Sequence, residues 1–142
     1  MTNTGTLMFN RSDDVSLNAA ISGNGSLTQA GSGNLTLRGN NTYTGNTTIS
    51  GGTMVVGDGA ANGSISTSAN IINNANLSFN RSDAVNLAKA ISGSGNVSQN
   101  GTGTLTLSAT NTYLGTTTVN NGSLVIGDGA TNGSIASSNI ID

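Results

Sequence analysis

The chain has 142 residues, a formal net charge of −2 and 7% charged side chains, and Gly, Asn, Ser and Thr occupy more than half of its positions. It contains no Cys, which excludes disulfides and thiolate metal sites. The slightly acidic balance offers no basic footprint for nucleic acid, and no apolar run approaches the ~20 residues of a membrane helix. A disordered chain usually combines low hydrophobicity with high net charge, and this chain lacks the second property.

Short segments recur along the chain in which two apolar side chains share one face and the residue between them points the other way. This alternation predicts β-strands rather than helices. In chain order these are residues 7–9, 15–17, 35–37, 77–79, 85–87 and 105–107. Two continuous apolar runs, residues 54–56 and 124–126, predict strands that are more fully buried. Gly and Asn tolerate positive φ, so the Gly- and Asn-rich segments between these runs predict tight corners.

The sequence repeats itself at a fixed interval, so that residues 9–13 recur as residues 79–83, and more than half of the positions in the first unit are identical in the second. A β-sandwich gives each strand a different neighbour, whereas a parallel solenoid stacks like on like, so the repeat favours a solenoid. We expect one all-β domain over residues 1–142, with repeat units 1–70 and 71–142 and about six coils of roughly 23 residues. The same argument predicts that Phe9 lies over Phe79 and that Tyr43 lies over Tyr113, three coils apart on one side.

Residues 31–57 read GSGNLTLRGNNTYTGNTTISGGTMVVG and residues 101–127 read GTGTLTLSATNTYLGTTTVNNGSLVIG. Both resemble the autotransporter-associated β-strand repeat, also called the passenger-associated transport repeat, of type V secretion passengers. The resemblance implies a right-handed parallel β-helix at the bacterial outer-membrane surface, forming a stalk that assists secretion of an adhesin. It also implies a translocator β-barrel in the parent protein. Residues 1–10 lack a signal-peptide pattern, so we expect a segment of a longer protein, in which Met1 is either native or an added start.

Charged residues give two candidate sites, each with a structural alternative. Asp58 and Asp128 lie in Gly-Asp-Gly sequences that are typical of calcium loops, but each loop offers one carboxylate, which favours a simple turn. The second cluster resembles the acid–base set of a β-helix polysaccharide enzyme and contains Arg11, Asp13, Asp14, Arg81 and Asp83. Because Asp14 becomes Ala84 while the Arg and Asp recur, we interpret Arg11 with Asp13 as a structural pair.

Threonines and tyrosines supply the remaining candidates. Residues 42–48 and 116–118 hold Thr groups that resemble an ice-binding array, but the spacing is irregular, which favours ordinary strand Thr. Tyr43 and Tyr113 are the candidate binding residues for surface glycans, provided that they are exposed.

These observations predict a non-catalytic display segment with no cofactor, no metal and no catalytic residues. Two alternatives remain, which are a glycan- or surface-binding adhesive module and an extracellular filament subunit that assembles head to tail. The second follows from the chain ends, which carry no evident polar cap, so the expected partners include further copies of the chain. Host or bacterial surface glycans are the other expected partners, and nucleic acid is not one.

Overall fold

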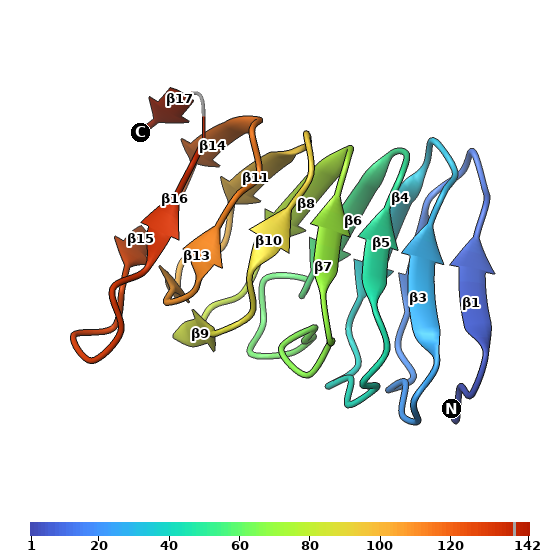
Figure 1. Cartoon of the computed structure of the whole chain (residues 1–142). Helices are drawn as coiled ribbons and strands as arrows, with labels where there is room; N and C mark the ends of the chain where they lie inside the picture. The colour runs from blue at the N-terminus through green and yellow to red at the C-terminus, as the bar shows by residue number, and fades with distance from the viewer. Residues whose placement is uncertain (138) are drawn as a thin grey trace.

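A computed structural model shows a parallel β-solenoid whose chain is described at residues 1–137 and 139–142 (Figure 1). Within these residues every regular element is a strand, and all strand pairs are parallel. The chain rises along the front sheet, turns over the top, descends behind and advances from right to left in Figure 1. This winding is right-handed, as the resemblance implied.

Each coil has three faces. We call the face that contains β1 face 1, the face that contains β2 face 2 and the face that contains β9 face 3. Face 1 is a five-stranded sheet that β13 and β16 continue, and its strands are β1 (Thr6–Phe9), β3 (Ser26–Gln29), β5 (Thr47–Ile49), β7 (Ile71–Asn73), β10 (Ile91–Ser92), β13 (Thr110–Asn111) and β16 (Ser134–Ile135). Face 2 is a seven-stranded sheet that contains β2 (Val15–Leu17), β4 (Asn34–Leu37), β6 (Thr53–Val56), β8 (Asn76–Phe79), β11 (Asn96–Gln99), β14 (Thr116–Val119) and β17 (Asn139–Ile141). Face 3 is a three-stranded sheet of β9 (Val85–Leu87), β12 (Thr104–Leu107) and β15 (Ser123–Ile126).

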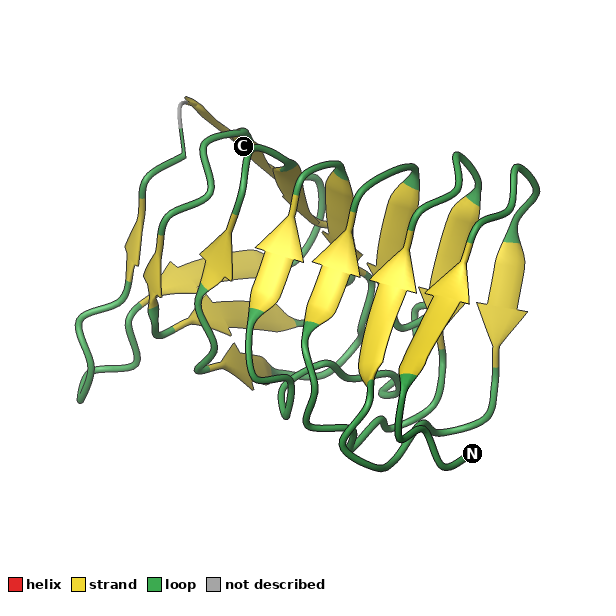
Figure 2. Cartoon of the chain, turned by 45° about the vertical axis from the view of Figure 1, so that its right-hand side comes forward, coloured by secondary structure: helices red, strands yellow, loops and turns green. Residues whose placement is uncertain are grey.

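Face 3 begins with short segments that are not named strands. Thr2 forms a parallel bridge with Ser22, and the Thr42 N–H donates to the Ile21 carbonyl at 2.8 Å. The Ser64 hydroxyl then donates to the Asn41 carbonyl at 2.8 Å, which places residues 64–66 on the next coil of this face. Figure 2 shows the resulting ladder of coils.

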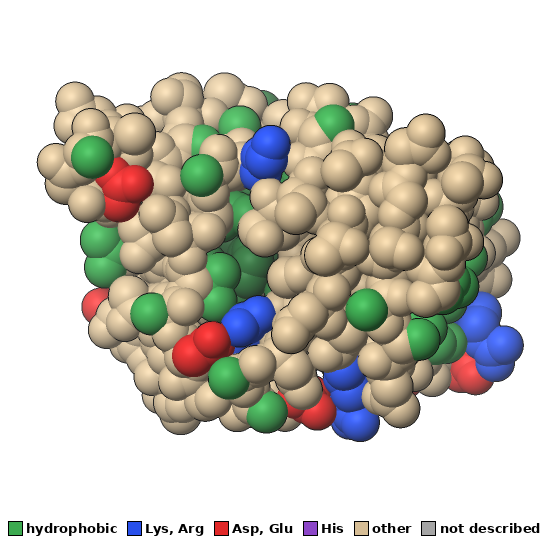
Figure 3. Space-filling model, turned by 90° about the horizontal axis from the view of Figure 1, so that it is seen from below, with side chains coloured by type: hydrophobic (Ala, Val, Ile, Leu, Met, Phe, Trp, Pro, Cys, Tyr) green, Lys and Arg blue, Asp and Glu red, His purple; other side chains and the backbone are tan. Residues whose placement is uncertain are grey.

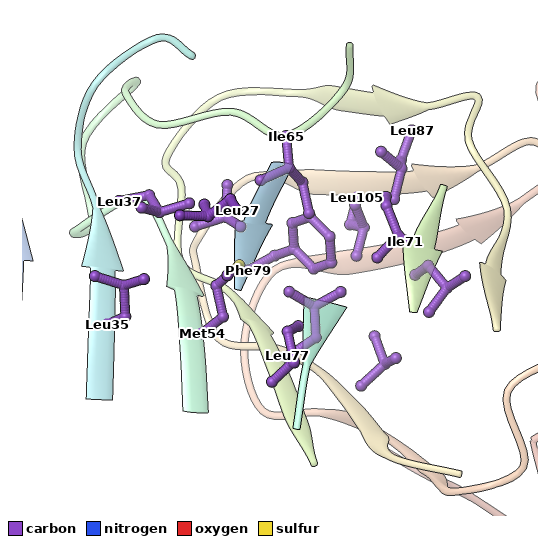
Figure 4. Close-up of a cluster of buried hydrophobic side chains, with 14 of the residues drawn as sticks. Leu27, Leu35, Leu37, Met54, Ile65, Ile71, Leu77, Phe79, Leu87 and Leu105 are labelled. Atoms are coloured by element: carbon purple, nitrogen blue, oxygen red, sulfur yellow. The ribbon is translucent and has the colours of Figure 1, made fainter. Parts of the chain in front are cut away.

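The interior is a narrow aliphatic core that runs along the solenoid axis. In most strands alternate residues point inward, and the buried set includes Leu27, Leu35, Met54, Leu77 and Leu105. Phe79 points into this interior between Ile65 and Leu77 (Figure 4). Burial of these rows, together with the ladder hydrogen bonds, stabilises the stack of coils.

Face 2 contributes one strand to each coil, so the solenoid has seven coils, close to the expected six. Most coils are similar in length, as the strand pairs Leu7↔Leu27, Leu27↔Thr47 and Leu35↔Met54 show. The coil that contains the loop at 57–63 is longer, because Thr47 pairs with Ile71 rather than with a residue near position 67.

The sequence repeat does not coincide with a whole number of coils. Three coils carry the chain from Leu7 through Leu27 and Thr47 to Ile71. The sequence equivalent of Leu7 is instead Leu77. The stretch from Ile71 to Leu77 carries the chain from face 1 around a corner to face 2. Each repeat unit therefore advances by three coils and one face.

This shift contradicts the predicted stacking of identical aromatic residues. Phe9 lies in β1 on face 1 and Phe79 lies in β8 on face 2, so the two rings occupy different sides of the solenoid. Tyr43 follows the face 3 segment at 41–42, whereas Tyr113 follows β13 on face 1. The prediction was wrong because it assumed that each repeat unit closes an integral number of coils.

Candidate functional site

The two tyrosines lie inside the solenoid, which contradicts the exposed position that the binding hypothesis requires. Both Tyr43 and Tyr113 are 0% exposed. The Tyr43 hydroxyl is 2.5 Å from the Thr47 hydroxyl, which is itself 2.6 Å from the Ser68 hydroxyl. The Tyr113 hydroxyl is 2.7 Å from that of Thr117. Burial raises the pKa of both phenols, so they remain neutral hydroxyls that close a corner and offer no surface for a ligand.

The asparagine two positions before each tyrosine joins neighbouring coils. The Asn41 side-chain oxygen accepts the Ile21 N–H at 2.8 Å, and its amide donates to the Ser64 carbonyl at 2.9 Å. Asn111 does the same with Ile91 and Ser134, at 2.9 and 3.0 Å. Each amide thus satisfies backbone groups of the coil before and the coil after it. Sequence reasoning missed this role, although the recurrence of Asn-Thr-Tyr in both units was its signal.

A buried glutamine organises a second kind of corner. The Gln29 amide donates to the carbonyls of Gly31 and Gly33 at 3.0 and 2.8 Å. Gln99 repeats these bonds to Gly101 and Gly103 at 3.1 and 2.9 Å. A side chain at Gly31 would place its Cβ 2.0 Å from the Arg11 carbonyl oxygen, so only glycine allows the two coils to approach.

The arginines of the charged cluster form local ion pairs with neighbouring aspartates. Arg11 binds Asp13 through two bonds of 2.8 and 2.6 Å, which confirms the structural interpretation, and Arg81 binds Asp83 at 2.9 and 2.7 Å. These guanidinium bonds lower the pKa of both carboxyl groups. Asp14 instead accepts the Asn34 backbone N–H at 2.9 Å. Among the described residues, Arg81 also donates to the Gly63 carbonyl, a bond that Arg11 lacks.

The Gly-Asp-Gly loops use their carboxylates to bind their own backbone. Asp128 accepts the N–H groups of Ala130 and Thr131 and the Thr131 hydroxyl, at 3.0, 2.7 and 2.8 Å. These bonds lower its pKa to about 2. Asp58 accepts the Ala60 N–H at 3.3 Å and pairs with Arg38 at 3.1 Å. Over residues 1–137 and 139–142, no three acidic, His or Cys side chains gather into a metal-ligating group.

The threonine groups do not form a flat outward array. Thr47 and Thr117 are buried and bond to the tyrosine hydroxyls, while Thr48, Thr116 and Thr118 are half-buried. A regular ice-binding surface needs exposed Thr at the same place on successive coils, and these positions alternate instead between the inside and the outside.

A hollow of about 190 Å³ opens on face 3 at the junction of the two repeat units. Its floor includes Val56, Ile65 and Phe79, and the lower view shows it as a recessed group of hydrophobic side chains (Figure 3). It lies where residues 64–66 and β9 adjoin without a ladder between them, since the face 3 sheet starts at β9. Arg81 is the charged residue among its described lining residues, and its bonds to Asp83 and Gly63 leave it little capacity for an anion.

Comparison with known proteins identifies the segments that carry these corners. The family of the passenger-associated-transport repeat matches twice, at residues 27–56 and 97–126. Searches of curated proteins and of solved structures return no match. Among the described residues, no helix is long and apolar enough to cross a membrane. Each matched segment runs from a face strand through the Gln and Asn-Thr-Tyr corners to the end of β6 or β15. Two segments of the chain, residues 27–56 and 97–126, therefore match the passenger-associated-transport repeat, and both lie within one parallel β-solenoid.

Proposed function

We propose that this chain is a non-catalytic stalk segment of an autotransporter passenger, which assists secretion by folding outside the cell and displays an adhesin. One observation supports this function above the others. The residues that recur in both matched repeats, Gln29, Asn41 and Tyr43 with Gln99, Asn111 and Tyr113, are used for contacts within and between coils. Such residues build the rod, and none of them lines the hollow on face 3.

The geometry suits a spacer. Seven coils at about 4.8 Å each give a rod of roughly 34 Å per chain. The outer surface is polar and carries few charges, and it has no cysteine that could cross-link during passage through a pore. A passenger repeat of this kind acts at the outer-membrane surface or outside the cell.

The pairing distances suit folding during export. Each strand pairs with strands one coil away along the chain, as Leu35 does with Met54 and Thr47 does with Ile71, so each coil needs only its predecessor as a template. Folding that advances one coil at a time prevents the exported part from sliding back, because a folded coil no longer fits a narrow pore.

The experiment places the chain between a signal peptide and the translocator domain of an autotransporter, and measures protease accessibility on intact cells. Tyr113→Ala removes the buried ring that closes a corner and should lower the fraction of passenger at the cell surface. Tyr113→Phe retains the ring and should export almost normally, and Leu114→Ser, at a neighbouring exposed position, serves as the matched control. Equal surface levels for Tyr113→Ala and the control would contradict a role of folding in secretion.

A further inference from the structure

The sequence contains five Asn-Gly pairs, in which the glycine nitrogen can attack the asparagine side chain because no Cβ shields it. The asparagines of these pairs are Asn24, Asn62, Asn100, Asn121 and Asn132. The reaction needs a nitrogen close to the side-chain carbonyl carbon, an N–H proton that is not bound to the main chain, and access for a base from the solvent. The fold meets these three conditions to different degrees in the five pairs.

The corner between β14 and β15 meets all three conditions. The Gly122 N–H donates to the Asn121 side-chain oxygen at 2.9 Å, and both residues are exposed. Because a C=O bond measures about 1.23 Å, the side-chain carbonyl carbon lies within about 4 Å of this nitrogen. A small rotation of the side chain therefore brings the two atoms into attacking range.

The main chain on both sides holds this geometry. The Asn121 N–H donates to the Gln99 carbonyl at 3.3 Å. The Ser123 N–H donates to the Gly103 carbonyl at 3.1 Å. Gly122 has a φ of 67°, and an added Cβ there would lie 2.2 Å from the Gly103 carbonyl oxygen, so the position requires glycine. The attacking nitrogen is thus both positioned and unhindered.

The exposure of this corner does not depend on the coil that follows it. In the first unit the equivalent residues are Gly51 and Gly52. Both remain partly exposed, although β8 pairs with β6 and covers the strand that follows this corner. A corner of this kind therefore stays open to water inside the stack.

Each of the other pairs lacks one of the three conditions. The N–H groups of Gly25, Gly101 and Gly133 donate to main-chain carbonyls at 2.9, 3.2 and 3.2 Å. The Asn100 side-chain oxygen is also held by an amide of the next coil at 2.6 Å. Gly63 is buried, so a base from the solvent does not reach its nitrogen.

We propose that Asn121 is a modification site at which the side-chain amide is lost spontaneously, giving aspartate and isoaspartate. A base removes the Gly122 N–H proton, and the nitrogen forms a bond to the Asn121 side-chain carbonyl carbon. The C–N bond of the side-chain amide then breaks, and its nitrogen takes up a proton and leaves as ammonia. Water adds to either carbonyl of the cyclic imide and breaks one of its C–N bonds. The net reaction consumes one water and releases one ammonia.

The products change the corner in two ways. Both introduce a negative charge beside Asn120, whose amide is part of a neutral ladder with Asn100. Isoaspartate also lengthens the main chain by one carbon between β14 and β15. Because Ser123 is paired with Thr104 directly after this corner, the extra carbon should loosen the pairing of β15 with β12.

Peptide mapping by mass spectrometry tests the proposal on the intact chain. The folded protein is incubated at mildly alkaline pH, and the conversion of each Asn-Gly pair is followed with time. A parallel sample in urea gives the rates in the absence of the fold. In the folded chain we expect Asn121 to convert at least about tenfold faster than any other pair, and in urea we expect similar rates for all five.

Two variants and the identity of the products complete the test. Asn121→Gln should abolish conversion at this corner, because the longer side chain must close a larger ring. Asn132→Gln is the matched control at another exposed Asn-Gly pair, and it should leave the rate at Asn121 unchanged. A folded-state rate at Asn121 no greater than at Asn24 or Asn132, the same preference in urea, or aspartate without isoaspartate would each overturn the proposal.

Discussion

The two repeat units fold into the same corners but place them on different faces of the solenoid. Gln29 closes the corner from face 1 to face 2, and Gln99 closes the corner from face 2 to face 3, with the same pair of hydrogen bonds. The local sequence therefore decides the shape of a corner. The length of each coil decides which side of the rod receives it and which strands lie above and below.

The copies differ where their neighbours differ. The Arg81 side chain is 14% exposed at the unit junction, whereas that of Arg11 is 58% exposed on the first coil. Equivalent residues should therefore differ in energy according to their surroundings, and substitutions in matched pairs can measure that difference.

The largest effect is expected from the two tyrosines. Tyr43→Ala and Tyr113→Ala should each lower the free energy of unfolding by about 4 kcal/mol, because each leaves a ring-sized cavity in the core. Tyr43→Phe and Tyr113→Phe should each cost about 1 kcal/mol, since each deletes the phenol hydroxyl that bonds to a buried threonine. Urea unfolding measures all four variants, and a loss for either Phe variant as large as that for its Ala counterpart would contradict the core position of the ring.

The next largest loss of stability is expected at the two corner glycines, and it should be equal in the two units. Gly31→Ala and Gly101→Ala bring a Cβ within 2.0 and 2.1 Å of the carbonyl oxygens of Arg11 and Arg81, so the coils must separate. Each substitution should cost about 3 kcal/mol in the same unfolding measurement. Gly5→Ala is the control, because no atom lies within 4 Å of its added Cβ. Unequal losses at Gly31 and Gly101 would show that the two corners are not equivalent.

A smaller effect should separate the two arginines. Arg81→Ala removes a partly buried ion pair and the bond to the Gly63 carbonyl, and should cost about 1 kcal/mol or more. Arg11→Ala breaks an exposed pair and should have a smaller effect on the urea midpoint. The difference should survive in about 0.5 M salt, because screening acts mainly on exposed pairs. A similar loss of stability for both variants would mean that the position of Arg81 at the unit junction does not strengthen its contribution.

The smallest predicted effect is a loss of stability at low pH that is caused by protonation of Asp128. Its pKa in the folded chain is about 2, below the ordinary 3.8, so its contribution is fully present above about pH 4 and is lost as the pH falls through about 2. Asp128→Asn should remove this part of the acid sensitivity, measured as the urea midpoint between about pH 4 and about pH 2. Thr131→Val should raise the pKa of Asp128 in an NMR titration, since it deletes the hydroxyl donor. An unchanged pKa in Thr131→Val would contradict the bonding described here.

The strands, the parallel stacking and the Arg11–Asp13 pair could be predicted from the sequence, because each depends on a short pattern. The faces could not, because they depend on the sum of three coil lengths, and the loop at 57–63 lengthens one of these coils. The tyrosines were misplaced for a different reason. Their polar surroundings resemble a surface, but Thr47 and Thr117, one short turn later, supply buried hydroxyl partners. That spacing was the signal for an internal corner.

The shift of one face per unit also fixes the symmetry of any longer rod built from such units. Three units complete ten coils before a side chain returns to its starting orientation, so the true axial period is about 48 Å. Fibre diffraction or a helical reconstruction of tandem copies would show a layer line at this spacing, and an antibody raised against one outer epitope would find it displayed in three directions around the axis.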